Sequence, residues 1–235
     1  LTEAEATGAL LCLDVTEAVL DEAIALGYNL VISHHPLIFK GYKSITGKDY
    51  VERCILKAIK NDIVIYSAHT NLDNAYGGVN YKIAEKIGLK NLQVLEPKEN
   101  SLQDDLTQVG AGIVGELDEP ETELEFLKRI KKTFEVGCVR HNRLTGREIQ
   151  KVALCGGAGA FLLPQAIRAG ADVFITGEIK YHDYFGHEGD ILMAEIGHYE
   201  SEQYTKEIFY SIIRDLFPNF ALQSSKINTN PIKYL

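Results

Sequence analysis

The sequence has 235 residues, of which 46% are hydrophobic, so it is long enough for one large domain or two small lobes with a proper core. Its 24 Lys and Arg residues against 33 Asp and Glu residues give a formal net charge of -9, which disfavours nucleic acid as a main ligand because phosphate binding depends on clustered cations. The densest basic run, 128–132, ends a helix-like segment that begins with acids, as a solvated helix does. No apolar run approaches the ~20 residues of a membrane span, and no signal peptide is recognisable, so we expect no membrane partner.

The first half of the chain predicts alternating strands and helices. Short apolar runs alternate with amphipathic segments, which is typical of an α/β fold whose sheet is covered on both faces. Thr16 is a suitable N-cap for the first helix, and Gly27 is a suitable stop. The expected elements are strand 9–14, helix 16–26, strand 30–33, helix 50–60, strand 63–67 and helix 79–87.

The middle of the chain, residues 91–115, is polar and lacks a clear hydrophobic period. Such a stretch is the best candidate for a linker or an insertion point. We therefore expect three parts, namely an N-terminal α/β lobe at 1–95, a linker or the site of a missing inserted domain at 96–110, and a C-terminal α/β lobe at 111–235.

The second half repeats the plan of the first. When residues 23–35 are aligned with residues 166–178, a glycine, a strand and the small hydroxyl residue at its end coincide without a gap. The predicted fold class is therefore α/β with two related lobes, although βαβ units also look alike for purely physical reasons. The expected elements here are strand 152–155, a glycine turn at 156–159, helix 161–169, strands 172–176 and 191–195, and helix 201–216.

The four cysteines are far apart in the sequence, and none forms a C-x-x-C pair. This pattern indicates reduced thiols in a cytoplasmic protein, and it excludes a zinc–thiolate framework built on closely spaced cysteines. The cysteines are Cys12, Cys54, Cys138 and Cys155.

Candidate functional residues gather at the expected ends of strands, where ligands bind in open α/β sheets. Imidazole and carboxylate without thiolate are the ligand set of Zn, Mn, Fe, Ni or Co. Asp14 and Cys155 also follow strands, but we interpret them as structural. The candidates are His34, His35, His69, Asp73, Glu178, Lys180, His182, His198, Glu200 and Glu202.

Two spacings favour metal binding over isolated structural histidines. If the backbone stays extended, His34 and His35 point to opposite faces and are better placed to serve two ions than one. His198 and Glu202 lie four residues apart, on one face at the start of a helix. A carboxylate in that position can bridge two metals that are ~3.5–4 Å apart. A lone histidine at a strand end is more often structural, but this combination favours a metal site.

The glycine turn at 156–159 follows a strand, yet it has neither the dinucleotide-binding nor the Walker spacing. Close packing between strand and helix is the better explanation for its glycines, although backbone N–H groups there could still meet a phosphate. Glu178 and Lys180 fit a solvated ion pair and a substrate contact about equally well.

Five motifs in order resemble the NIF-three-like family, whose members are named GTP cyclohydrolase 1 type 2 homologs. The resemblance covers nearly the whole chain. The motifs are VISHHP at 31–36, HTNLD at 69–73, VALCGGAG at 152–159, TGEIKYHD at 176–183 and GHYESE at 197–202.

The resemblance implies a dinuclear metal centre between two α/β lobes and a ring-shaped homohexamer, a trimer of dimers. His69 is implied to lie beside the centre as a proton-transfer or orienting group. Long members of the family carry an extra domain where residues 96–110 lie here, so this is a short form or a sequence that lacks the insert and an N-terminal piece. The implied metal ligands are His34, His35, Asp73, His198 and Glu202, with Glu202 as the bridge.

The function expected from this resemblance is hydrolysis of a purine nucleotide, GTP, by two divalent ions that present hydroxide to a carbon such as guanine C8. His69 or His182 would transfer protons, and Lys180 with nearby backbone amides would hold the triphosphate. Two alternatives stay open. One is a metal-dependent phosphoesterase or amide hydrolase with another substrate, and the other is a metal-binding hexameric scaffold without turnover.

Overall fold

Residues 5–98 and 109–235 are described by the structure, a computed structural model. The chain divides into two compact units. The first contains residues up to Leu72 together with Thr205–Ile232, and the second contains Asp73–Tyr204 together with Lys233–Leu235. These boundaries differ from the expected ones near 95 and 111, because the end of the chain returns to the first unit and residues 73–95 belong to the second.

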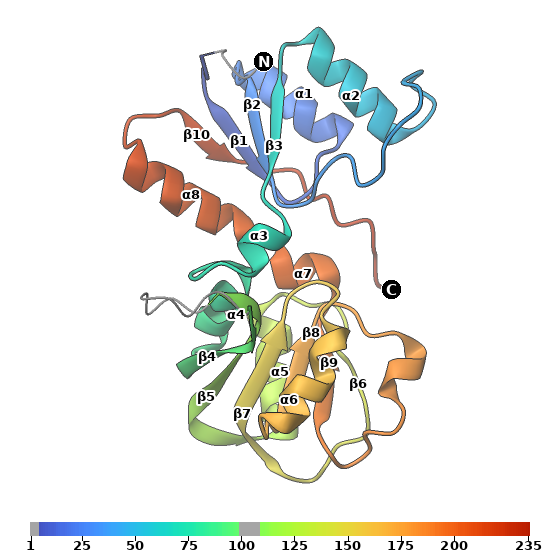
Figure 1. Cartoon of the computed structure of the whole chain (residues 1–235), viewed down its shortest axis with the longest axis vertical. Coiled ribbons are helices and arrows are strands. Elements are labelled where there is room, and N and C mark those ends of the chain that lie inside the picture. The colour runs from blue at the N-terminus through green and yellow to red at the C-terminus, as the bar shows by residue number, and fades with distance from the viewer. Residues whose placement is uncertain (1–4, 99–108) are drawn as a thin grey trace. The chain divides into compact units, whose positions relative to one another are not determined.

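The first unit is built on a four-stranded parallel sheet in the order β10-β1-β2-β3. Helices α1 and α2 pack against each other, and α8 packs against β1 and β10 (Figure 1). The short helix α3 (Thr70–Asp73) spans the boundary of the unit. The other elements are β1 (Ala9–Cys12), α1 (Glu17–Leu26), β2 (Leu30–Ser33), α2 (Tyr50–Lys60), β3 (Val64–Ser67), α8 (Thr205–Leu216) and β10 (Leu222–Ser224).

The core of the first unit lies between its sheet and helices α1 and α2. Leu10, Leu20 and Val31 are completely buried there, and burial of such side chains is the main favourable contribution to folding. The Thr16 hydroxyl accepts a hydrogen bond from the Val19 N–H at 3.3 Å and caps α1 as expected. The loop before α2 is ordered around Glu52, a buried carboxylate that accepts hydrogen bonds from the Thr46 N–H at 2.8 Å and the Lys48 N–H at 3.1 Å.

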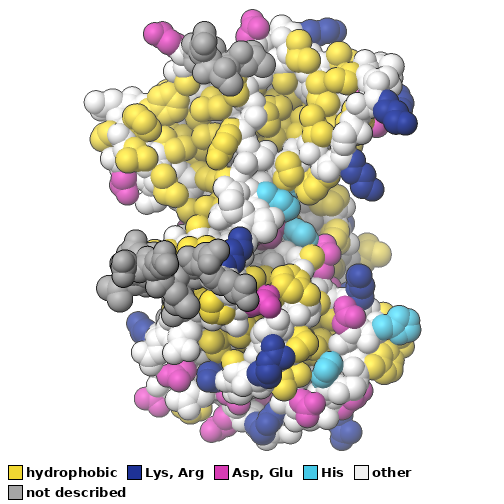
Figure 2. Space-filling view, in the orientation of Figure 1, with side chains coloured by type: hydrophobic (Ala, Val, Ile, Leu, Met, Phe, Trp, Pro, Cys, Tyr) yellow, Lys and Arg dark blue, Asp and Glu magenta, His cyan; other side chains and the backbone are white. Residues whose placement is uncertain are grey.

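Large hydrophobic side chains are also exposed on the first unit, and Figure 2 shows hydrophobic groups over much of its visible face. The side chains of Phe39 and Ile59, for example, are 66% and 59% exposed. Exposed apolar side chains that gather on one part of a protein are typical of an interaction surface.

The second unit contains a six-stranded mixed sheet in the order β4-β5-β7-β8-β9-β6. Strands β7, β8 and β9 are parallel, and the other neighbours are antiparallel (Figure 1). The strands are β4 (Lys90–Pro97), β5 (Gly110–Thr122), β6 (Arg140–His141), β7 (Glu148–Cys155), β8 (Val173–Thr176) and β9 (Leu192–Glu195). The helices are α4 (Val79–Ile87), α5 (Glu123–Thr133), η1 (Ala160–Leu162), α6 (Leu163–Arg168), η2 (Tyr181–Tyr184) and α7 (His198–Glu202).

The polar stretch at 91–115 is not a linker at its two ends, because residues 90–97 and 110–122 are the paired strands β4 and β5. Polar residues and glycines hid their strand pattern. A Cβ on Gly115 would lie only 2.9 Å from the Lys90 carbonyl oxygen, so close approach of the two backbones requires glycine there. Residues 99–108 of the expected linker lie outside the described residues.

Two expected helices also differ in detail. The helix expected at 201–216 is two helices, α7 and α8, with α7 beginning earlier at His198 after Gly197, whose φ is 89°. The helix expected at 161–169 is a 3-10 turn, η1, followed by α6. The earlier start of α7 matters for function because it places His198 in the first turn of the helix.

The internal repeat predicted from the sequence is matched by the backbone. Gly27 and Gly170 occupy equivalent positions and have φ values of 70° and 68°, which end α1 and α6 in the same left-handed conformation. The same hydrogen bonds then position the strands in both units. The matched donor–acceptor pairs are Tyr28–Ala23 with Ala171–Ala166, Val64–Asn29 with Leu192–Asp172, and Ala68–Ser33 with Ile196–Thr176.

Among the described residues, no helix combines the length and the apolar character needed to cross a membrane.

Candidate functional site

Three imidazoles form a cluster at one edge of the first unit's sheet, hereafter the histidine cluster. His34 and His35 follow β2, and His69 follows β3, so the parallel pairing of these strands brings all three to the same edge. Their ring centroids are 4.9 to 5.4 Å apart. One ring nitrogen from each lies within 4.8 Å of the others, which is close enough for the group to hold a metal ion.

The adjacent histidines do not point to opposite faces, contrary to the expectation for an extended backbone. Strand β2 ends at Ser33, and the Ser33 hydroxyl donates a 2.8 Å hydrogen bond to the His35 carbonyl oxygen. His34 and His35 therefore lie beyond the end of the strand, and the planes of their rings form an angle of 50°. The pair can therefore contribute to a common cluster.

Hydrogen bonds fix the orientation of both rings. His34 Nδ1 lies 2.9 Å from the Ala68 carbonyl oxygen, and His35 Nδ1 lies 2.7 Å from Asp14 Oδ1. The other Asp14 oxygen accepts a 2.6 Å hydrogen bond from the Thr229 hydroxyl. A metal-binding histidine commonly engages one ring nitrogen in this way and coordinates through the other, so Nε2 is the atom through which either ring could coordinate a metal ion.

Asp14, which we interpreted as structural from the sequence, is thus also a functional candidate. It follows β1, the strand beside β2, and parallel pairing brings it next to His35. A carboxylate acceptor fixes the imidazole tautomer and makes the ring a better ligand. Its position one strand away from the histidine pair was the signal available in the sequence.

The second unit carries His198 and Glu202 on one face of α7, as the four-residue spacing predicts. His198 Nε2 lies 3.1 Å from Glu202 Oε2, and His198 Nδ1 lies 2.8 Å from Glu178 Oε1. Burial lowers the pKa of His198, but hydrogen bonds and opposite charges from Glu202 and Glu178 outweigh this and raise the pKa above its ordinary value. His198 therefore repeats the arrangement of His35, with Nδ1 held by a carboxylate.

The glycine turn of residues 156–159 makes room for this helix. Gly157 has a φ of 61°, and a Cβ there would overlap Glu202 Oε1 and lie 3.3 Å from His198 Nε2. The Gly157 N–H donates to the Ser201 hydroxyl at 3.0 Å, and its carbonyl accepts from the Glu178 N–H at 3.0 Å. These contacts explain the glycine by close packing around the candidate ligands, as the sequence reasoning preferred.

Asp73 lies near the same turn within the second unit. The Asn80 side chain donates a 2.9 Å hydrogen bond to the Asp73 carbonyl oxygen and accepts one of 2.9 Å from the Gly156 N–H. Burial and, to a smaller extent, the negative charges of Asp73 and Glu202 raise the pKa of the Cys155 thiol to about 12. Asp73, His198 and Glu202 are called the acidic cluster below.

Asn80 escaped the sequence analysis because it lies inside α4 and its partners are far away in the chain. It is 2% exposed and ties the segment of Asp73 to the glycine turn. The available signal in the sequence was an asparagine near the start of an amphipathic helix.

The remaining candidates lie on the loop after β8. Lys180 and Glu178 line a groove of about 380 Å³ together with Phe161 and Asp183. The His182 ring lies on η2, and its centroid is 5.3 Å from that of Tyr181. Both the role of Lys180 in binding a triphosphate and that of His182 in proton transfer stay predictions.

The donor chemistry of the two clusters fits divalent metal ions. Imidazole nitrogen and carboxylate oxygen suit Zn, Mn, Fe, Ni and Co, and the rings of His34, His35 and His198 each have Nδ1 engaged by an oxygen atom. The structure contains histidine and acidic groups that could hold metal ions.

The motifs and the fold agree with the Duf34/NIF3 (NGG1p interacting factor 3) family, whose profile matches residues 1–231. The chain belongs to this family.

Bacterial relatives that are named GTP cyclohydrolase 1 type 2 homologs align with most of this chain. A GTP cyclohydrolase 1 type 2 homolog of Lactococcus lactis is 34% identical over 97% of this chain and 85% of its own length. One of Clostridium perfringens is 36% identical over 85% of this chain and 75% of its own length. One of Staphylococcus aureus is 27% identical in an alignment of 336 positions, so it carries residues within the aligned span that this chain lacks.

Solved structures of the family share the fold. A hypothetical protein of Staphylococcus aureus has a TM-score of 0.89 with 32% identity, over 99% of this chain and 89% of its own. A protein of Bacillus cereus related to NIF3 has a TM-score of 0.86 with 26% identity, over 98% of this chain and 90% of its own.

Proposed function

We propose that the protein is a metal-dependent hydrolase in which the histidine cluster and the acidic cluster together hold two divalent ions, with Glu202 as the bridge. The observation that carries this proposal is the hydrogen bonding of two imidazole rings. His35 and His198 each present Nδ1 to a carboxylate, Asp14 and Glu178 respectively, at 2.7 and 2.8 Å. Metal-binding histidines commonly have such a pairing, which fixes the tautomer and the ring orientation.

When bound, two divalent ions would lower the pKa of a water molecule toward neutrality and stabilise negative charge in the transition state. The protein contributes the positions of the ligands and the movement of protons. His69 lies in the histidine cluster, with its ring centroid 5.8 Å from that of Phe39, and would accept or return a proton.

The proposed substrate is a purine nucleotide, GTP, as the printed names of the relatives suggest. Addition of one water at guanine C8 opens the imidazole ring to a formamide, and a second water releases that carbon as formate. Lys180 supports this substrate, because it lines the groove beside Glu178 and offers a cation for the phosphates.

The test is an assay of purified protein loaded with Mn or Zn. We expect GTP to be consumed with release of formate, and we expect a Glu202→Ala variant to be inactive. Unchanged GTP without formate would overturn GTP hydrolysis. Cleavage in a parallel panel of phosphoesters and cyclic amides would then favour a hydrolase with another substrate. If a metal-free His34→Ala, Glu202→Ala variant retained every cellular phenotype, the scaffold alternative would replace catalysis.

We also propose that the protein acts in the cytoplasm as a homohexamer. Its four cysteines are free thiols, which suits a reducing compartment. The exposed apolar side chains of the first unit, such as Phe39 and Ile59, offer surface for contacts between subunits. Light scattering and crosslinking of the purified protein test the oligomeric state.

A further inference from the structure

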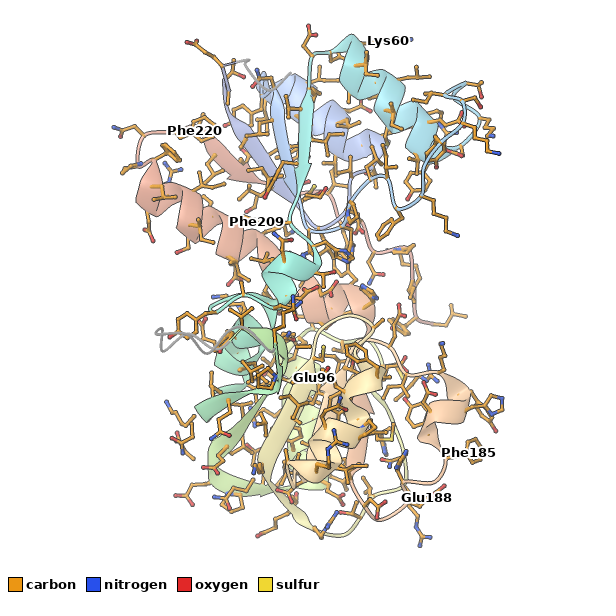
Figure 3. All side chains as sticks on the ribbon, viewed as in Figure 1. Lys60, Glu96, Phe185, Glu188, Phe209 and Phe220 are labelled. Carbon is orange, nitrogen blue, oxygen red and sulfur yellow. The ribbon has the colours of Figure 1, made fainter. Side chains whose placement is uncertain are left out.

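The second unit contains another groove, separate from the one lined by Lys180 and Glu178. It has a volume of about 610 Å³, which lies within the range of small-molecule pockets. One wall comes from the segment around β6 and the other from η2 and the loop after it. Figure 3 labels Phe185 and Glu188 on that loop. The lining residues are Val139, Arg140, His141, Asn142, Arg143, Tyr181, Tyr184, Phe185 and Glu188.

The wall formed by β6 is fixed to the sheet. Arg140 pairs with Glu195 of β9 in antiparallel register. Asn142 then extends this pairing with its side chain, which donates to the Ile191 carbonyl at 2.9 Å and accepts from the Met193 N–H at 2.9 Å. A groove whose wall is held by a strand and an amide clamp is preorganised, so little entropy is lost when a ligand binds.

The opposite wall is aromatic and exposed. Tyr181 is 69% exposed and Phe185 is 56% exposed, and their ring centroids lie 5.4 Å apart in an edge-to-face arrangement. The Tyr184 hydroxyl donates to Glu195 at 3.2 Å, which anchors η2 below them. Two aromatic rings held in place but open to solvent offer a stacking surface for a planar ligand.

The lining of the groove includes Arg140 and Arg143 against one carboxylate, Glu188, although the whole chain carries a net charge of -9. Arg140 lies over the Tyr184 ring at 5.7 Å and is paired with Glu195 at 2.8 Å. Arg143 is exposed and forms no ion pair with any residue that the structure describes. A guanidinium in this position can bind a phosphate or carboxylate with two parallel hydrogen bonds.

We propose that this groove binds a planar aromatic anion, with the ring against Tyr181 and Phe185 and the anionic group at Arg143. Nucleoside monophosphates and aromatic carboxylates both have this chemistry. The groove is distinct from the ligand clusters of the proposed hydrolase, so the inference does not depend on that function. Stacking alone would accept neutral rings, and Arg143 alone would accept any anion. The combination selects ligands that carry both features.

The test is isothermal titration of the full chain with GMP, guanosine, inorganic phosphate and 4-hydroxybenzoate. We expect GMP or 4-hydroxybenzoate to bind, and the one that binds more tightly identifies the source of the ligand. Guanosine and phosphate should bind at least about tenfold more weakly than GMP if GMP is the ligand, because each makes only part of the contacts. Arg143→Ala and Tyr181→Ala should each weaken binding by about tenfold, since charge-assisted hydrogen bonds and ring stacking are each of this size.

Two control variants separate this groove from the rest of the unit. Arg168→Ala removes an exposed arginine outside the groove, and Phe161→Ala removes an aromatic ring from the groove of Lys180. Both should bind the probe as the unchanged protein does. Binding that is lost in Phe161→Ala but kept in Arg143→Ala and Tyr181→Ala would overturn the proposal, as would failure of both aromatic anions to bind. GTP turnover measured in parallel reports separately on the proposed hydrolase.

Discussion

Replacing Asp14 by Asn should weaken metal binding without unfolding the protein. Asp14 Oδ1 lies 2.7 Å from His35 Nδ1, and its other oxygen is held by Thr229 at 2.6 Å, so the carboxylate is fixed in place to polarise the ring. Loss of its charge makes His35 a weaker ligand and permits the wrong tautomer. Removal of such orienting partners typically lowers metal affinity by about 10–100-fold, or about 1.4–2.7 kcal/mol.

The assay is a competition titration of Zn or Mn between the protein and a chelator of known affinity, together with a thermal melt of each variant. Asp21→Asn is the matched control, because it removes an exposed carboxylate of the same unit that pairs with Lys57 and not with a histidine among the described residues. We expect this control to bind metal as the unchanged protein does. Equal metal affinity of Asp14→Asn and Asp21→Asn would refute the idea that Asp14 orients a metal ligand.

Three further predictions concern the ligand clusters and the fold. Glu178→Gln should weaken metal binding by about 10–100-fold through His198, as Asp14→Asn does through His35, and an unchanged affinity would speak against this. Gly157→Ala and Gly170→Ala both place alanine at a positive φ and should each lose about 1–2 kcal/mol of stability, but only Gly157→Ala should displace Glu202 and lower metal affinity. Burial raises the pKa of Glu52, but hydrogen bonds from Thr46 and Lys48 outweigh this and lower the pKa to about 2. Glu52→Gln should therefore reduce the melting temperature at neutral pH, and the reduction should shrink as the pH falls below 4.5. A reduction that stays constant with pH would contradict this.

Much of the α/β framework was predictable because apolar periodicity and end signals are local. Strand β2 and helices α2 and α4 have the expected bounds, and Gly27 ends α1 as its position suggests. Strands β4 and β5 were missed because their stability comes from pairing with each other and with β7, which no local pattern reports. Tertiary pairing overrides weak local preference in such strands.

The candidate ligands were also predictable, since strand ends in an α/β sheet meet at one edge. Their partners were harder to find. Asp14 and Asn80 act on residues 21 and 76 positions away in the chain, so only the folded structure shows their contacts. We expected His34 and His35 to point to opposite faces, and this differs from the structure because the strand ends at Ser33, whose hydroxyl donates a hydrogen bond to the His35 carbonyl oxygen. The groove of Tyr181 and Arg143 has no sequence signature, because its walls come from separate segments.

The most direct test of the proposed metal centre is elemental analysis by mass spectrometry of the protein purified without added metal. We predict about two divalent ions per chain, as in dinuclear hydrolases, and their loss in a His34→Ala, Glu202→Ala double variant that still shows a cooperative thermal melt. A chain that carries no metal, and takes up none after loading and gel filtration, would contradict the proposal that the histidine and acidic clusters form a metal centre.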